Sequence, residues 1–175
     1  MDAPQEMDVV EETIMGELSA SARRVQQALD SCGVQLKVVE LPASTRTALD
    51  AAQAIGCQVG QIIKSLVFKG KRSERPILVI ASGINRVDEK RIEALIGEPL
   101  GKADADFVRG HTGFVIGGVP PVGHTEKIQT FIDEDLIQYD QLWAAAGTPN
   151  AVFRLSAQDL LKISDGEVTA IKQEA

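Results

Sequence analysis

Two apolar runs, separated by a short basic loop, constrain the fold of this chain more than any other feature. The first run is "IIKSLVFKG", residues 62–70, and the second is "RPILVIAS", residues 75–82. β-branched and aromatic residues favour strands, and a short Gly-containing loop between two such runs is typical of a hairpin. The sequence therefore predicts two strands paired around the loop at residues 70–75.

Lys64 lies inside the first apolar run. Side chains of a strand alternate between its two faces, so Lys64 shares a face with Leu66 and Phe68. One interpretation is a strand lysine that extends its ammonium group to water along the apolar surface. The other is a partly desolvated cation with a lowered pKa, which can serve as a positive anchor. Alternation alone leaves both interpretations open.

The remaining chain shows helix and strand patterns without strict β-α-β alternation and without a G-x-G-x-x-G motif. Caps are predicted at Thr45 or Thr47, at Asp88, and at Ser156 with Asp159 in a capping box. We expect helices at residues 19–33, 44–56, 83–97, 104–113, 140–147 and 156–164. Further strands are expected at residues 34–41, 98–103, 114–119, 128–137, 150–156 and 166–172. This order predicts an α+β fold with a mixed, bent or partly barrel-like sheet flanked by helices.

The length of 175 residues suits one folded domain, which we place at residues 18–175. Residues 1–17 hold six acidic residues and no basic residue, and we expect them to form a mobile acidic leader. No apolar run approaches the roughly 18–20 residues that span a bilayer, and the N-terminus lacks the features of a secretory signal. Cys32 and Cys57 form no C-x-x-C pair. These observations predict a reduced, cytoplasmic protein with no membrane partner.

The net charge of −7 is unevenly distributed, because residues 61–91 hold eight basic residues and three acidic ones. This pattern excludes a polybasic protein that binds long DNA duplexes, which needs many phosphate contacts. The basic segment is compatible with a small contact area on the end of an RNA. The alternative is that these basic residues only solvate a hairpin loop.

Several common catalytic motifs are absent. The chain has no P-loop, no G-x-S-x-G and no H-E-x-x-H, and His111 and His124 are its only histidines. A His-rich metal site is thereby excluded, and neither a metal nor a cofactor is predicted. An enzyme with this sequence would act through positioning, backbone donors and a cation.

The segment "TGFVIGGVPPVGH", residues 112–124, is a candidate binding loop. Gly117 and Gly118 permit close approach of another backbone or a ligand, and Gly123, followed by His124, can adopt a positive φ. Such a loop can hold an amino group, a ribose hydroxyl or an ester carbonyl. The alternative is a tight turn between strands, in which Gly and Pro serve only the backbone conformation.

Five segments carry a resemblance to a known family: "IIKSLVF", "SGINRVD", "TGFVIGGVPPVGH", "FIDEDL" and "AAAGTPNAVFRLSAQDLL". In their order and spacing, the chain from about Arg23 to Ile171 resembles the YbaK/prolyl-tRNA-synthetase-associated domain family. The lysine-serine strand and the G-x-x-x-P loop are the more specific parts. The resemblance implies hydrolysis of mischarged aminoacyl-tRNA, chiefly tRNA(Pro) carrying a wrong small amino acid. With no synthetase domain attached, it further implies a free-standing editor that acts in trans.

The resemblance makes Lys64 the catalytic residue. Together with the loop pattern, it gives the following candidate substrate-binding residues: Ser65, Thr112, Gly113, Gly117, Gly118, Pro121, Gly123, His124 and Asp133. The implied partners are the acceptor end of aminoacyl-tRNA and, as a second candidate, prolyl-tRNA synthetase. Cys, Ala and 2-aminobutyrate are the candidate amino acids, and the serine after Lys64 favours Cys or 2-aminobutyrate.

Two alternatives to an editing enzyme stay open. The same fold could bind a tRNA end or a synthetase without hydrolysis, or the acidic leader could recruit a basic partner.

Overall fold

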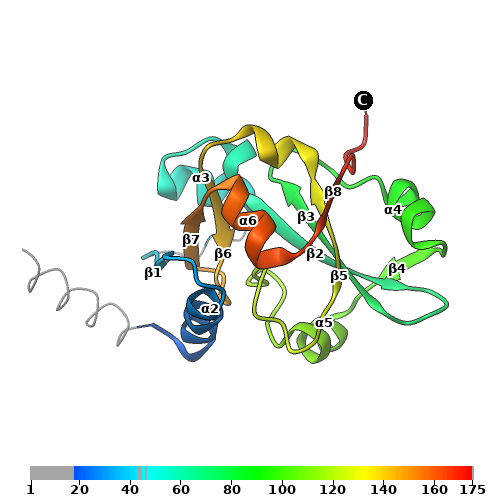
Figure 1. Cartoon of the computed structure of the whole chain (residues 1–175), viewed down its shortest axis with the longest axis horizontal. Helices are drawn as coiled ribbons and strands as arrows, with labels where there is room; N and C mark the ends of the chain where they lie inside the picture. Colours follow the sequence, from blue (N-terminus) through cyan, green and yellow to red (C-terminus); the bar gives the residue numbers. More distant parts are fainter. Residues whose placement is uncertain (1–17, 43–44, 46, 175) are drawn as a thin grey trace, which may run out of the picture.

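The computed structural model describes residues 18–42, 45 and 47–174. These residues form an α+β domain with mixed sheets, which confirms the predicted fold class (Figure 1). The acidic segment 1–17, predicted as a leader, lies outside the described residues.

The strands form two sheets joined by one bridge. The five-stranded sheet has the order β4 (Leu100–Lys102), β2 (Ile63–Gly70), β3 (Pro76–Ser82), β5 (Gln129–Asp133), β8 (Glu167–Thr169). The three-stranded sheet has the order β1 (Val38–Glu40), β7 (Ala151–Leu155), β6 (Leu142–Ala145). β2 and β3 form the predicted antiparallel hairpin, whereas β5 runs parallel to both β3 and β8. A single parallel bridge between Ile62 and Trp143 connects the sheets.

The helices begin at the capping residues that the sequence indicates. Thr47, Asp88 and Ser156 cap their helices, because each side chain accepts a hydrogen bond from a backbone N–H of the first turn. Ser156 and Asp159 form the predicted capping box. The α-helices are α2 (Ala20–Ser31), α3 (Ala48–Ile55), α4 (Glu89–Ile96), α5 (Ala105–Thr112) and α6 (Ala157–Ser164), and short 3₁₀-helices lie at η1 (Val59–Gln61) and η2 (Glu134–Gln138).

Two predictions about local structure are wrong. Residues 140–147, predicted as a helix, contain strand β6, because Leu142–Ala145 pair along their length with β7. Helix propensity of an alanine run is a weak preference that tertiary pairing overrides. Residues 114–119, predicted as a strand, form a turn in which the Gly118 N–H donates to the Val115 carbonyl (3.0 Å) and Gly117 has φ of +89°.

Two predicted strands are shorter than expected. Residues 128–137 form a strand only to Asp133, whose side chain then caps the 3₁₀-helix η2. Residues 34–41 contribute only Val38–Glu40 to the sheet.

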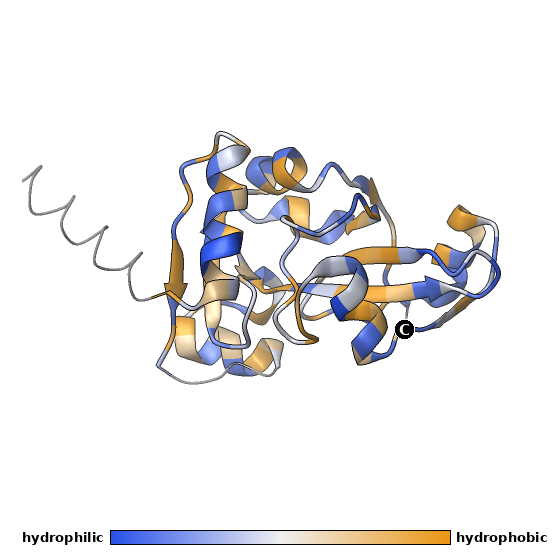
Figure 2. Ribbon diagram, turned by 90° about the horizontal axis from the view of Figure 1, so that it is seen from below, coloured by the Kyte–Doolittle hydropathy of each residue, from blue (hydrophilic) through white to orange (hydrophobic). Residues whose placement is uncertain are grey.

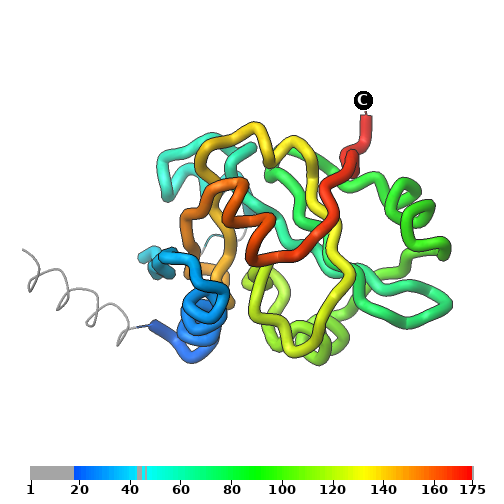
Figure 3. The backbone as a smooth tube through the Cα atoms, in the orientation of Figure 1, coloured from blue at the N-terminus to red at the C-terminus, as the bar shows by residue number. Residues whose placement is uncertain are grey.

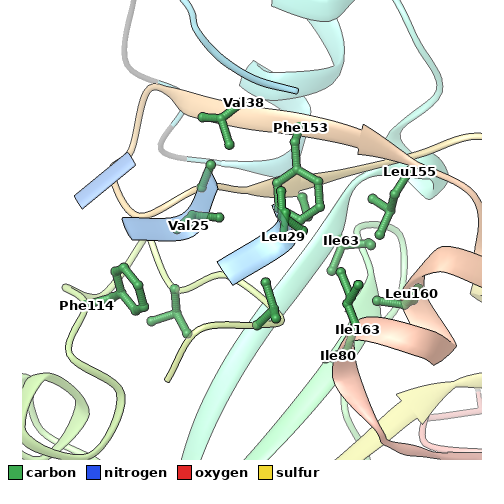
Figure 4. Packing of buried hydrophobic residues seen from close by; sticks show 14 of the residues in the cluster. Val25, Leu29, Val38, Ile63, Ile80, Phe114, Phe153, Leu155, Leu160 and Ile163 are labelled. Atoms are coloured by element: carbon green, nitrogen blue, oxygen red, sulfur yellow. The ribbon is translucent and has the colours of Figure 1, made fainter. Parts of the chain in front are cut away.

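The main hydrophobic core lies between the two sheets. α2, α6 and the loop after α5 fill this space, as Figure 4 shows for Leu29, Leu160 and Phe114, which belong to the same cluster as Phe153 of β7. A second cluster, including Val79, Ile92 and Phe131, packs on the opposite face of the five-stranded sheet under α4. Figure 2 shows the corresponding apolar colour along the strands and polar colour at the tip of the hairpin. No helix among the described residues is long and apolar enough to span a bilayer.

Gly118 fixes the loop after α5 against the turn between β6 and β7. The Gly147 N–H donates to the Gly118 carbonyl (2.8 Å), and a Cβ at position 118 would lie 2.8 Å from the backbone of Gly147 and Thr148. We expect Gly118→Ala to lower the free energy of unfolding by about 1–3 kcal/mol, because overpacking must displace backbone. Urea unfolding followed by fluorescence of Trp143, the single tryptophan, measures this change.

Gly110→Ala is the matched control. A Cβ at Gly110, within α5, meets no heavy atom within 4 Å. Alanine in a helix is favoured over glycine by about 0.5–1 kcal/mol, so this variant should be as stable as the wild type or more so. Equal stability of the two alanine variants would contradict the packing role of Gly118.

Candidate active site

A cavity of about 710 Å³ opens between α3, β2, β6 and the turn at residues 115–118. Its walls are mainly aliphatic and include Trp143, and the only ionisable side chain among the described residues that line it is that of Lys64. Cavities of this size commonly hold small ligands. The arrangement brings a single cation to an otherwise apolar wall.

The Lys64 ammonium group is half-buried and donates a hydrogen bond to the backbone carbonyl of Asn85 (2.5 Å). Burial lowers its pKa from the usual value, and repulsion by Arg86 adds to this effect, whereas attraction to Asp133 opposes it. An ammonium group has three N–H donors, so two stay available to a ligand. Of the two interpretations left open by the sequence, the structure favours the partly desolvated cation.

β2 has an unpaired edge at the cavity. The Gly83 N–H donates to the Ile62 carbonyl (2.7 Å) and the Gly70 N–H to the Arg75 carbonyl (3.0 Å), so even-numbered residues of β2 direct their backbone groups to β3. The odd-numbered Ser65 and Val67 therefore direct theirs to the opposite edge. Among the described residues, β4 pairs only with Phe68–Gly70 and no strand pairs with the edge beside Ser65 and Val67. Strand backbone is thus presented to a ligand in the cavity.

The Ser65 hydroxyl is buried and has no hydrogen-bond partner in the described part of the chain. Ser65 lines the cavity beside Lys64. Buried hydroxyl groups are nearly always hydrogen-bonded, so this one retains unused donor and acceptor capacity. Ser65 stays a predicted substrate-binding residue.

The segment 112–124 contributes to the site mainly through Gly117. Gly117 and Ile116 both line the cavity. A Cβ at Gly117 would meet nothing within 4 Å, so space does not require glycine here. The backbone conformation does favour it, because φ is +89°. Thr112 is fully buried, and its hydroxyl donates to the Val108 carbonyl (2.6 Å) and accepts from the Phe114 N–H (3.1 Å). Gly113 ends α5 with φ of +83°. The structure therefore gives Thr112 and Gly113 roles in shaping the loop.

Pro121, Gly123 and His124, which follow the turn in the chain, lie outside the cavity wall. Pro121 is buried, and Gly123 has φ of +83° close to Ala28 of α2. His124 Nε2 lies 2.7 Å from the Pro120 carbonyl, and since a carbonyl oxygen only accepts, this nitrogen carries the hydrogen. Pro121, Gly123, His124 and Gly118 do not line the cavity. Of the residues predicted in this loop, only Gly117 lies at the cavity wall, where Ile116 and Val119 join it.

Asp133, predicted to bind substrate, has no solvent-exposed surface. Its carboxylate accepts from the backbone N–H groups of Ser82 (3.0 Å) and Asp135 (3.0 Å). It also accepts from the side-chain amide of Asn85 (2.7 Å). Direct contact between this carboxylate and a ligand is blocked by the chain itself, and Asp133 acts on the site through Asn85.

Several cavity residues were not predicted from the sequence. Trp143 was placed in a helix, and Leu49, Gly83 and Ile116 carried no recognisable motif of their own. Gly83 had one available signal: it follows an apolar strand, where glycine often marks a close backbone approach. A Cβ at Gly83 would lie 2.5 Å from the Val59 carbonyl oxygen.

Comparisons with known proteins agree on the family of this chain. Residues 42–163 match the model of the aminoacyl-tRNA editing domain. A solved structure described as a candidate trans-editing enzyme for prolyl tRNA synthetase is 52% identical, with a TM-score of 0.86, and the match covers 90% of this chain and all of that one.

Two curated relatives are more distant. The uncharacterised protein YwhH of Bacillus subtilis is 30% identical over 131 residues, which cover 75% of this chain and 83% of YwhH. The candidate Cys-tRNA(Pro)/Cys-tRNA(Cys) deacylase EbsC of Enterococcus faecalis is 26% identical over 129 residues, which cover 71% of this chain and 76% of EbsC.

The buried ring of His124 makes the stability of the loop depend on pH. Burial lowers the pKa of His124 below the usual histidine value of 6.5, although the hydrogen bond to Pro120 opposes the shift. The folded chain thus binds fewer protons here than the unfolded chain, so the stabilisation is complete above pH 6.5 and is lost as the pH falls through the folded pKa. We expect the free energy of unfolding to decrease between pH 7.5 and pH 5, as measured by urea unfolding.

His124→Gln separates this contribution from the rest, because the glutamine amide can donate to Pro120 and does not titrate. The decrease towards pH 5 should be smaller in this variant than in the wild type. An unchanged pH dependence would show that His124 is not the group responsible.

Proposed function

Because this chain belongs to the aminoacyl-tRNA editing domain family and hydrolyses mischarged aminoacyl-tRNA, we propose that its substrate is tRNA(Pro) carrying cysteine. The observation that supports the site most strongly is the position of Lys64 as the one ionisable group among the described lining residues. The similarity to EbsC and the orphaned hydroxyl of Ser65 support cysteine over alanine and 2-aminobutyrate.

Lys64 stabilises the charge that develops during ester hydrolysis. Water adds to the ester carbonyl carbon, and the carbonyl oxygen becomes an oxyanion beside the Lys64 ammonium group. The tetrahedral intermediate then releases the ribose oxygen, so that the products are free amino acid and uncharged tRNA. Positive charge fixed in an apolar, water-poor site acts strongly on such an oxyanion.

Proton transfer is assigned to the substrate. No carboxylate, thiol or imidazole of the described residues lines the cavity, and Lys64 is assigned to the oxyanion, so no further side chain there is available as a general base. The neighbouring ribose hydroxyl of the terminal nucleotide can take the proton from the attacking water and pass it to the leaving oxygen. An aminoacyl ester is already activated, so this limited machinery suffices.

The cavity and its surroundings accommodate the acceptor end of the tRNA. Its volume of about 710 Å³ exceeds what a cysteinyl group fills, which leaves room for the terminal adenosine. Leu49 and Ile116 line the cavity and are more than half exposed, so they offer apolar contact to an adenine ring. The hairpin loop carries basic residues for the adjoining phosphates: Lys69, Lys71, Arg72 and Arg75.

Glu98 holds this hairpin loop in place, because its carboxylate accepts from the backbone N–H groups of Arg72 (2.9 Å) and Ser73 (3.0 Å). The loop is thereby ordered, and the exposed side chains of Lys71, Arg72 and Arg75 can reach phosphate groups, whereas Lys69 pairs with Glu74. Phosphate contacts of this kind provide affinity that does not depend on sequence.

We place the activity in residues 18–175, in the cytoplasm where tRNA is charged. Prolyl-tRNA synthetase is the proposed source of the mischarged substrate, and the chain edits it in trans. The likeness to a structure described as a candidate trans-editing enzyme for that synthetase supports this arrangement.

Lys64→Ala should lower the rate constant for deacylation of Cys-tRNA(Pro) by a factor of about 10²–10³, the usual effect of removing one oxyanion-stabilising group. Single-turnover assays with radiolabelled cysteine measure the rate. Lys127→Ala is the control, because Lys127 is almost fully exposed and pairs only with Asp165. A Lys64→Ala chain that hydrolyses Cys-tRNA(Pro) at the wild-type rate would disprove the proposed function.

Ser65→Ala tests the preference for cysteine. A hydrogen bond from the substrate thiol to Ser65 is worth about 0.5–1.5 kcal/mol, so kcat/KM for Cys-tRNA(Pro) should fall about 3- to 10-fold. Hydrolysis of tRNA(Pro) carrying 2-aminobutyrate, which has a methyl group in place of the thiol, should change less than 2-fold by the same reasoning. Equal losses on both substrates would show that Ser65 does not recognise the thiol.

A further inference from the structure

The Asn85 side chain lies between two carboxylates while its backbone contacts the catalytic lysine. Its amide nitrogen is 2.7 Å from Asp133 Oδ2 and 2.8 Å from Asp135 Oδ2. Carboxylates accept hydrogen bonds, so both amide hydrogens are used and the orientation of the amide is fixed. The Asn85 carbonyl oxygen accepts from the Lys64 ammonium group (2.5 Å).

Both carboxylates are themselves held in place. Asp133 ends β5 in the middle of the sheet, is fully buried, and accepts the Ser82 and Asp135 N–H groups. The Asp135 carboxylate also accepts from Lys172 (3.0 Å), and these hydrogen bonds from Asn85 and Lys172 lower the pKa of Asp135. Asn85 is therefore bonded to a rigid part of the fold.

The backbone on both sides of Asn85 is anchored as well. Its N–H closes a turn to the Ser82 carbonyl (3.0 Å). The Gln173 N–H donates to the Arg86 carbonyl (2.8 Å), and Val87 forms a bridge with Lys172. Figure 3 traces this C-terminal segment from its position beside β5 to the loop that follows β3.

We propose that Asn85 is the positioning residue for Lys64. Asp133 and Asp135 hold the side-chain amide of Asn85, and this fixes the Asn85 backbone carbonyl, which directs the lysine ammonium group towards the acyl ester in the cavity. This inference rests on the proposed function, because it assigns Asn85 a role in the same reaction.

The chemistry of the asparagine side chain explains why this residue stands here. A primary amide offers two N–H donors to two acceptors, which no aliphatic or hydroxyl side chain can do. An aspartate at position 85 would add a third carboxylate to the pair. Ordering the flexible side chain of a lysine costs conformational entropy. A fixed backbone carbonyl orders it before the substrate binds, so that this cost does not weaken binding.

Asn85→Ala keeps the carbonyl that Lys64 contacts but removes the amide that fixes it. We expect kcat for Cys-tRNA(Pro) to fall at least 10-fold while KM changes less than 3-fold. Asn150→Ala is the matched control, because Asn150 does not line the cavity and its amide donates to the Leu41 carbonyl. Equal kcat for the two variants would overturn the proposal.

A double-mutant cycle with Lys64→Ala shows whether Asn85 acts through the lysine. Asn85→Ala should have little further effect on kcat once Lys64 is absent. An equal fold-loss in both backgrounds would overturn the positioning role and leave the proposed function intact. Full activity of Lys64→Ala alone would overturn both.

Asp133→Asn provides a second variant should Asn85→Ala fail to fold, since an amide oxygen can still accept from Ser82. The charges that act on Lys64 are Asp133 at the end of β5 and Arg86 in the loop after β3. Without the carboxylate, the Lys64 pKa falls further, so the loss of kcat at high pH should begin at a lower pH than in the wild type. A purely structural role for Asp133 predicts an unchanged pH profile, and that result would contradict the proposal.

Discussion

The free energy of placing the Lys64 ammonium group at the wall of an apolar cavity has to be offset by contacts elsewhere in the fold. A desolvated cation is unfavourable unless hydrogen bonds and opposite charge compensate for lost water. Here the Asn85 backbone carbonyl supplies the hydrogen bond and buried Asp133 supplies the opposite charge. The order of strands β2, β3 and β5 brings these groups together, and so links the sheet topology to the chemistry.

The cavity itself arises from an interruption in strand pairing. β2 pairs with β3 along its length. Among the residues that the structure describes, the chain at its other edge pairs with β6 only at the bridge between Ile62 and Trp143, and with β4 only from Phe68 onward. Between these points the sheet opens, and the edge of β2 at Ser65 and Val67 becomes a wall of the cavity. α3 and the turn at Gly117 close the space around it. One strand therefore supplies both the proposed catalytic cation and the backbone that lines the cavity.

The sequence predicted those features that depend on neighbouring residues. The hairpin, the helix caps at Thr47, Asp88 and Ser156, and the unusual position of Lys64 all follow from local chemistry and alternation. The sequence did not predict β6, because its alanine-rich segment becomes a strand only through pairing with β7. The turn at residues 114–119 was mistaken for a strand, because the docking of Gly118 on Gly147 is a contact between distant segments. The role of Asn85 was not predicted for the same reason, because the carboxylates that bind its amide, Asp133 and Asp135, lie about 50 residues away along the chain.

The central claim is that the Lys64 ammonium group meets the carbonyl oxygen of the aminoacyl ester. A crystal structure with a stable analogue, in which an amide joins cysteine to the ribose of adenosine, tests this claim most directly. The account predicts the analogue carbonyl oxygen within hydrogen-bonding distance of Lys64 Nζ, about 3 Å, with the cysteine thiol at Ser65. An analogue bound in the cavity with its carbonyl directed away from Lys64 would contradict it.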